Sequence, residues 1–327
     1  FEKDDLFRTQ DELTRDIVAA LPGHMEADWL EKSRRKRADN FVAYDYAMKA
    51  WDLLYNHGGE EHAAIRSLVK QALALEPGYA QAQSMLAYTW MLTWFRNQDP
   101  TALDAADREA ARGVALDPSD GWCQFVRGYV ALYHHRYDEA EAHYYRAIAL
   151  NPRHVGALTN LAGIRQRDQR LPEAVKLFIE AVRLAPEDAE VCAQLGRAMA
   201  DADDLQGARR VFAEAVRRDP TLLRAHIGRH LLLPNIYADE ADITAARAAY
   251  ADGMTVLESE LPRAAAPLAA AARLDGLRWS NFLLAYQGRD DRALQARYGA
   301  LATHLVASAD ESWAEAAGRR VAGGRKV

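Results

Sequence analysis

The chain has 327 residues, half of them hydrophobic, and carries a formal net charge of −6 with an isoelectric point near 6.0. This acidic balance disfavours nucleic acid as a partner, because nucleic-acid binding needs a basic surface. The sequence shows no run of 18 apolar residues and no signal-peptide pattern, which predicts a cytoplasmic protein with no membrane partner. The two cysteines, Cys123 and Cys192, lie far apart in the sequence, and we expect both to be reduced and packed inside.

Residues 1–40 are predicted to form a helical lead-in. Apolar residues recur at helical spacing from Leu6 to Leu21, and Pro22 ends the helix. The following stretch, roughly 25–38, is basic and either presents a solvated face or binds an anionic partner. The solvated face is favoured, because the interleaved aromatic residues of a nucleic-acid-binding surface are missing.

From Asn40 onward, a six-residue pattern ending in proline recurs, as in Ala147–Pro152. The prolines of successive copies are Pro77, Pro118, Pro152, Pro186 and Pro220. The first interval between them is longer than the next three, which are equal. A constant period of about 34 residues is typical of an array of helix pairs that stack on their neighbours. Proline ends the second helix of each pair, because it disfavours helical backbone at the residue before it.

Three adjacent units carry the pattern most fully: 121–154, 155–188 and 189–222. Each has small residues at places 8, 20 and 27 and an aromatic residue at place 24, namely Gly128, Ala140, Tyr144 and Ala147; Ala162, Ala174, Phe178 and Ala181; and Gly196, Ala208, Phe212 and Ala215. The small residues allow close helix packing, and the aromatic residue fills the space between the helices. This pattern resembles the tetratricopeptide repeat family. The resemblance implies an all-α fold, a right-handed α-solenoid of about five helix pairs over residues 41–222.

The predicted array departs from the pattern in three places. The first two units are looser, with extra residues near 56–60 and near 94–101. Arg127 occupies place 7, where an apolar residue is usual, so the packing around it is not predicted by the pattern.

Residues 223–310 are predicted to form a different, C-terminal helical module, followed by a linker or tail at 311–327. Asp239 is expected to cap a helix that Pro262 and Pro267 interrupt. A last helical pair is expected after it, with Trp279 in its first helix.

No catalytic motif is found: the sequence has no Gly-rich phosphate loop, no HExxH and no paired CxxC. Histidines gather in two places, with His226 and His230 four residues apart and His134, His135 and His143 around one turn. Either group has the residue type for zinc or copper, but no carboxylate or cysteine pattern completes a site, so ordinary packing or surface roles are favoured. We predict no metal site, no cofactor and no catalytic residue in this chain, and leave open whether its parent protein is an enzyme.

Protein binding is the function that the array predicts. The family resemblance implies that the first helices line a concave groove, and the repeat register assigns places 2, 5, 6, 9 and 12 to it. The candidate peptide-binding residues are Tyr88, Trp122, Phe125, Tyr129, Asn160, Gln166, Gln194 and Arg197. The aromatic residues could take apolar side chains of a protein or peptide, while Asn160 or Gln194 could hydrogen-bond its backbone. Alternatively, several of these aromatic residues could pack between repeat units.

Two further resemblances point to larger parent proteins. Residues 233–243 (LPNIYADEADI) and 284–299 (LAYQGRDDRALQARYG) resemble the segment before the catalytic lobes in bacterial relatives of SPINDLY and O-linked N-acetylglucosamine transferase. That resemblance implies the substrate-presenting region of a bacterial protein O-glycosyltransferase. Residues 4–150 resemble the tetratricopeptide tails of bacterial nucleotide cyclases, which implies a regulatory or scaffold tail. In both cases covalent neighbour domains are expected beyond the chain ends, and a free-standing adaptor is the third alternative.

Overall fold

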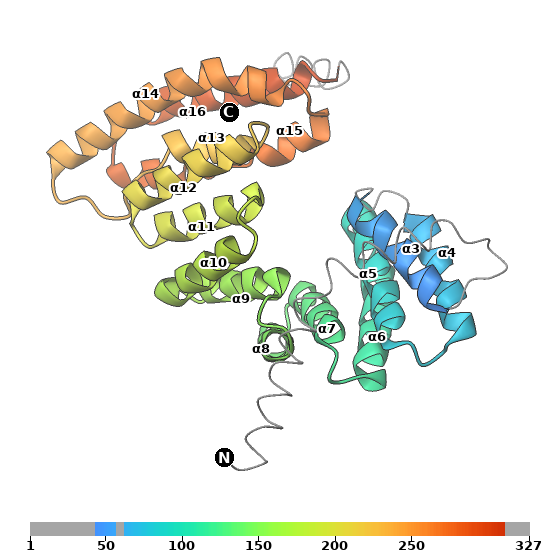
Figure 1. The fold of residues 1–327 in the computed structure, drawn as a ribbon. Coiled ribbons are helices and arrows are strands. Elements are labelled where there is room, and N and C mark those ends of the chain that lie inside the picture. The colour runs from blue at the N-terminus through green and yellow to red at the C-terminus, as the bar shows by residue number, and fades with distance from the viewer. Residues whose placement is uncertain (1–42, 57–61, 311–327) are drawn as a thin grey trace, which may run out of the picture. The chain divides into compact units, whose positions relative to one another are not determined.

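The computed structural model describes residues 43–56 and 62–310, and within these ranges all regular elements are helices (Figure 1). The predicted lead-in at 1–40 and the predicted tail at 311–327 lie outside the described residues. Most of the extra residues predicted near 56–60 also lie outside them.

The chain divides into two compact units, unit 1 (Phe1–Ile164) and unit 2 (Arg165–Val327). The described helices of unit 1 are α3 (Ala43–Asn56), α4 (His62–Leu75), α5 (Ala80–Asn97), α6 (Pro100–Leu116), α7 (Gly121–Tyr133), α8 (Tyr137–Leu150) and α9 (Val155–Arg167), whose last residues belong to unit 2. Unit 2 continues with α10 (Leu171–Leu184), α11 (Ala189–Asp201), α12 (Leu205–Arg218), α13 (Leu223–His230), α14 (Glu240–Ala265), α15 (Ala270–Gly276), the 3-10 helix η2 (Phe282–Gln287) and α16 (Arg292–Ala307). This division does not coincide with the boundary proposed at residue 222, which stays a prediction.

The turn inside each helix pair repeats with the period of the sequence. His135, Gln169 and Asp203 occupy the same place in three successive units, and all three adopt left-handed backbone with φ of 59°, 62° and 64°. A left-handed residue closes the end of the first helix and reverses the chain. Directly after the third of these turns, Asp204 caps α12, because its Oδ1 accepts a hydrogen bond from the Gly207 backbone N–H at 2.9 Å.

Small residues stand where the two helices of a pair touch. A Cβ atom added at Gly128 in α7 would lie 2.9 Å from the Tyr144 ring in α8. A Cβ added at Gly196 in α11 would lie 3.1 Å from the Phe212 ring in α12. Both pairs join place 8 to place 24, so the close packing predicted from the repeat is present in both units.

The extra residues predicted near 94–101 lengthen two helices instead of forming a loop. Helix α5 has 18 residues and α6 has 17, whereas α7 has 13 and α8 has 14. Pro100 begins α6 at a position where a missing N–H costs nothing, and Asp99 caps the helix by accepting from the Thr101 N–H at 2.9 Å.

The prediction that Pro262 interrupts its helix is wrong. Helix α14 begins after Asp239, whose Oδ1 accepts from the Asp242 N–H at 2.9 Å as expected, and it continues through Pro262 to its end. Leu261 and Ala265 are fully buried on either side of the proline. Their packing holds the helical backbone although one backbone hydrogen bond is lost.

The last helical pair also differs from the prediction, because Trp279 lies between α15 and η2 and not inside a helix. Two buried tyrosines tie down this segment. The Tyr298 hydroxyl donates to the Leu277 carbonyl at 2.6 Å, and the Tyr250 hydroxyl donates to Asn281 Oδ1 at 2.5 Å. Trp279 packs against two hydrophobic clusters of unit 2.

Candidate functional site

Four of the predicted groove residues meet in one aromatic cluster of unit 1, formed by Tyr88 of α5 with Trp122, Phe125 and Tyr129 of α7. Near-parallel stacks join Tyr88 to Tyr129 and Phe125 to Tyr129, each with ring centroids 5.8 Å apart. Trp122 lies 5.6 Å from Tyr88 and 5.5 Å from Phe125. The repeat register therefore brings together the aromatic side chains that it assigns to the first helices of two neighbouring pairs.

The rings of the aromatic cluster contact one another and also other rings of unit 1, among them Trp51, Phe95 and Tyr133. Phe125 is only 8% exposed and also packs on His154, with centroids 4.4 Å apart. Burial raises the pKa of Tyr88 and of Tyr129. The Trp122 Nε1 is buried without a hydrogen-bond partner in the described part of the chain. Packing between helices accounts for Phe125, while Tyr88, Trp122 and Tyr129 keep part of their surface exposed.

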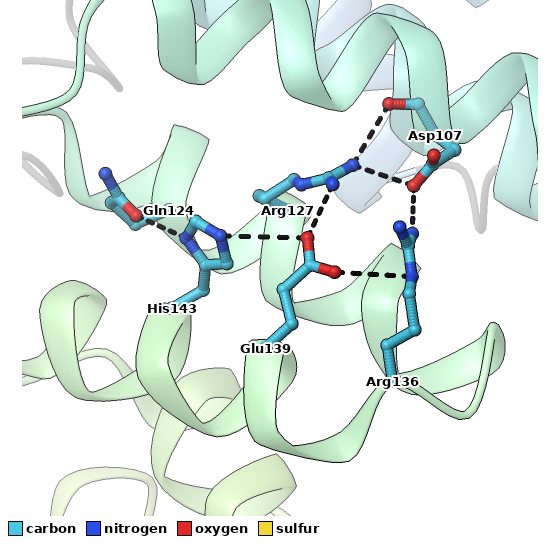
Figure 2. A network of polar contacts seen from close by, with 6 residues as sticks. All are labelled: Asp107, Gln124, Arg127, Arg136, Glu139 and His143. Atoms are coloured by element: carbon cyan, nitrogen blue, oxygen red, sulfur yellow. Dashed lines mark hydrogen bonds and ion pairs between the residues drawn. The ribbon is translucent and has the colours of Figure 1, made fainter.

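Arg127, the departure from the repeat pattern, joins three helices of unit 1 (Figure 2). Its Nη1 donates to Asp107 Oδ1 of α6 at 2.7 Å, and its Nη2 lies 2.5 Å from Glu139 Oε1 of α8. Arg136 contacts the same two carboxylates. Burial raises the pKa of Asp107, but the contacts with Arg136 and Arg127 outweigh this effect and hold it below its usual value. A polar junction thus replaces the apolar contact that is usual at place 7.

His143 belongs to the same junction. Gln124 Nε2 donates to the Pro118 carbonyl at 2.7 Å, so its Oε1, 2.7 Å from His143 Nδ1, accepts the proton of that nitrogen. Burial and the nearby Arg127 lower the pKa of His143. These contacts give the histidine a structural role, and no group of three potential metal ligands comes together among the described residues.

The second histidine group, His226 and His230, connects α13 to α14 through Glu260. His226 Nε2 donates to the Pro220 carbonyl at 3.0 Å, and its Nδ1 lies 3.1 Å from Glu260 Oε2. His230 Nε2 lies 3.4 Å from the same carboxylate oxygen. The two histidines therefore share one carboxylate and serve helix packing.

Of the predicted polar residues of α9, Gln166 is held by a neighbour, and Asn160 lies near the buried Tyr144 hydroxyl. That hydroxyl has no hydrogen-bond partner among the described residues, and burial raises the pKa of Tyr144. Gln166 Nε2 donates to Asp201 Oδ2 at 2.5 Å, and Arg197 Nε donates to Asp201 Oδ1 at 3.2 Å. Gln166 and Arg197 thus converge on one carboxylate of unit 2.

Unit 2 contains a cavity of about 310 Å³, which we call the α11–α13 cavity. Its lining combines residues of α11, α12 and α13 with α15 and the segment after it, and comprises Glu190, Ala193, Gln194, Arg197, Phe212, Arg224, Asp275, Arg278 and Trp279. Two predicted groove residues, Gln194 and Arg197, are among them. Because α11 and α13 contact each other and are the first helices of successive pairs, this cavity lies on the side that the register assigns to binding.

Both carboxylates of the α11–α13 cavity are paired with one arginine. Arg224 Nη1 lies 2.7 Å from Glu190 Oε1, and its Nη2 lies 3.0 Å from Asp275 Oδ2. The Arg197 guanidinium lies over the Trp279 ring, 5.7 Å from its centroid. The cavity therefore presents Trp279 and Arg197 beside Arg224, whose charge is paired with Glu190 and Asp275.

The predicted groove residues include only Gln194 and Arg197 of this lining. Arg224 stands one full repeat period after Glu190, so extending the period by one helix beyond Pro220 would find it. Asp275 of α15 and Trp279 after it follow no period, and tertiary hydrogen bonds to Leu277 and Asn281 hold the segment that contains Trp279.

Comparison with known proteins supports the repeat architecture. Residues 125–189 and 165–222 match the model of a tetratricopeptide repeat family. The Pseudomonas aeruginosa pilF structure has a TM-score of 0.51 at 18% identity and covers 67% of this chain and 92% of its own. PilW, described as a type IV pilus biogenesis factor, has a TM-score of 0.50 at 14% identity and covers 68% of this chain and 95% of its own. The fold is an all-α tetratricopeptide solenoid, with tetratricopeptide repeats over 125–222.

Two curated relatives match part of this chain. The regulatory protein AfsR of Streptomyces griseus is 31% identical over 145 residues, which is 42% of this chain and 14% of the relative. The putative adenylate cyclase 3 of Rhizobium meliloti is 29% identical over 141 residues, which is 42% of this chain and 24% of the relative. The chain thus matches less than a quarter of the length of either protein. Its described helices include none with the length and apolar character that a membrane span requires.

Proposed function

We propose that the chain is a protein-binding scaffold whose α11–α13 cavity receives an extended segment of a partner protein. The observation that carries this proposal is the placement of Gln194, Arg197 and Trp279 around one cavity between successive first helices. Amide and guanidinium groups can hydrogen-bond a peptide backbone or acidic side chain, and the tryptophan offers an apolar face.

We further propose that the scaffold serves a bacterial regulatory or signalling protein and works in the cytoplasm. The two curated relatives favour this parent over a protein O-glycosyltransferase, although each is matched over a short share of its length. The glycosyltransferase alternative rests only on the resemblance of 233–243 and 284–299. Packing is another explanation for the residues found in these two stretches. Gln287 Nε2 donates to the Tyr237 hydroxyl at 2.6 Å, and Arg289 pairs with Glu240. Sequencing the gene on both sides of this chain tests the choice: a cyclase or other signalling domain is expected, and nucleotide-sugar-binding lobes would contradict it.

The scaffold proposal is tested by selecting random peptides on the immobilised whole chain. We expect enriched peptides that bind the chain in solution and lose binding when Gln194 and Arg197 are both replaced by alanine. The Arg183→Ala variant is the matched control, because Arg183 pairs with Glu180 on the exposed surface of α10. Failure to enrich any binding peptide would contradict the proposal.

A further inference from the structure

A second cavity, of about 230 Å³, adjoins the α11–α13 cavity. We call it the α13–η2 cavity, and its lining comprises Arg197, Ala200, Asp201, Leu231, Leu232, Leu233, Asn235, Tyr250, Trp279, Ser280, Asn281, Phe282 and Leu283. Arg197 and Trp279 line both cavities, so the two cavities meet at these side chains. A ligand that fills both cavities must therefore contact Arg197 and Trp279, as an extended chain can.

The α13–η2 cavity is mainly apolar. Leu231, Leu232 and Leu233 supply successive buried side chains that are 2%, 7% and 6% exposed. At its edge Phe282 is 62% exposed and packs edge-on against Tyr286, which is 69% exposed, with centroids 5.0 Å apart. Exposed apolar rings beside a hollow mark interaction surfaces. The volume is below the roughly 300 to 1,000 Å³ of small-molecule sites, and suits one large apolar side chain.

Asn281 is one of several polar residues in the lining of the α13–η2 cavity, beside Arg197, Asp201, Asn235 and Ser280. Asn281 lines the cavity and is 9% exposed, and its Oδ1 is held by the Tyr250 hydroxyl at 2.5 Å. In this orientation the amide oxygen faces Tyr250, and no described residue accepts a hydrogen bond from Nδ2. The amide therefore keeps a donor for a carbonyl oxygen of a ligand.

In the α11–α13 cavity each arginine has an acidic neighbour, but guanidinium donors remain. Arg224 already pairs with both carboxylates of the lining, Glu190 and Asp275. Arg197 uses only Nε, toward Asp201, and Arg278 is 75% exposed and lies 3.9 Å from Asp275. The guanidinium donors that remain favour an anionic group on the ligand.

We propose that the two cavities together form one site for an extended peptide that carries an acidic side chain close to a large apolar side chain. The carboxylate binds Arg197 and Arg278, the apolar side chain enters the α13–η2 cavity, and a backbone carbonyl accepts from Asn281 Nδ2. This inference rests on the proposed scaffold function and adds the chemistry of the partner.

Fluorescence anisotropy with the whole chain tests the proposal. The probes are labelled nine-residue peptides of glycine and serine, blocked at both ends, with one glutamate and one leucine separated by zero to four residues. We expect one separation to bind best, with affinity falling at least tenfold when its leucine becomes serine and at least fivefold when its glutamate becomes glutamine.

Three protein variants locate the site. Arg197→Gln should weaken the best peptide at least fivefold, and Phe282→Ser about threefold. Asn281→Asp keeps the acceptor for Tyr250 but removes the donor, so it should weaken binding at least tenfold, also for the peptide whose glutamate is glutamine. Arg183→Gln is the matched control and should leave affinity unchanged. Circular dichroism spectra and melting temperatures identify folded variants.

Three results would overturn the proposal: no peptide of the series binds, leucine is dispensable, or folded Asn281→Asp and Phe282→Ser variants bind as tightly as the parent. The scaffold function would survive these results if random peptides of other chemistry are still enriched and depend on Gln194 and Arg197. If no random peptide is enriched either, both proposals fail.

Discussion

The two units use the first helices of their repeats in different ways. In unit 1, the first helices α5 and α7 carry Tyr88, Phe125 and Tyr129, whose rings stack on one another. In unit 2, the first helices α11 and α13 carry smaller or polar side chains, among them Ala193 and Gln194, and a cavity of about 310 Å³ remains. The same repeat places therefore either complete the packing or leave a binding cavity, depending on the volume of the side chains that occupy them.

This comparison predicts that a substitution in the aromatic cluster of unit 1 lowers stability, whereas a substitution in the cavity of unit 2 weakens peptide binding. Phe125→Ala should lower the free energy of unfolding by about 4 kcal/mol, because it removes a buried ring and leaves a cavity. Arg197→Gln should change it by less than about 0.5 kcal/mol, since its side chain is 52% exposed, and should affect only peptide binding. Urea unfolding followed by circular dichroism measures both effects. Equal losses of stability would contradict the division of roles.

The ion-pair junction of unit 1 should have the next largest effect. Arg127→Leu restores the residue type that the repeat prefers but leaves Asp107 and Glu139 with Arg136 alone, so we expect a loss of roughly 2 to 3 kcal/mol. Arg183→Leu, on an arginine that is 65% exposed, is the matched control and should change stability by less than about 0.5 kcal/mol. If Arg127→Leu is stabilising, the ion pairs of Arg127 do not stabilise unit 1, and an apolar residue at place 7 is the more stable choice.

Unit 1 should also lose stability in mild acid through His154. Its Nδ1 accepts from the Ala157 N–H at 3.2 Å, and burial lowers the pKa of His154 from 6.5 to about 4. The folded state therefore prefers the neutral imidazole, so this contribution is complete above pH 6.5 and is lost as the pH falls toward 4. Between pH 7 and pH 5 the loss should be about 2 kcal/mol.

The His154→Asn variant isolates this effect, because asparagine can accept from the same N–H and does not titrate. Urea unfolding at pH 7 and at pH 5 should show a smaller loss for the variant than for the parent chain. Hydrogen exchange of α7 and α9 should increase in the parent chain at pH 5. Identical pH dependence in both chains would show that other groups cause the loss.

Sequence periodicity predicts the helix pairs well because each repeat buries the same small and aromatic places, as Gly128 with Tyr144 and Gly196 with Phe212 illustrate. It also assigns Gln194 and Arg197 to the side where a cavity is found. Trp279 could not be predicted in this way, because its place depends on buried tyrosines distant in sequence. Nor does periodicity reveal whether neighbouring rings fill a space or leave it open, since that depends on side-chain volumes from several helices.

The smallest effect should be common to both units and comes from their turns. His135 in unit 1 and Gln169 in unit 2 both hold left-handed backbone, at φ of 59° and 62°, which costs a residue with a Cβ roughly 1 to 2 kcal/mol. Glycine removes this strain but adds freedom to the unfolded chain, so Gln169→Gly should gain about 0.5 kcal/mol. His135→Gly should gain less, because it also loses the contact of Nδ1 with the Tyr137 hydroxyl at 2.9 Å.

Lys176→Gly, at an exposed position inside α10, is the control and should lose about 1 kcal/mol. Melting temperatures compare the three variants, and a loss of stability in Gln169→Gly would mean that the turn residue contributes more than its backbone conformation.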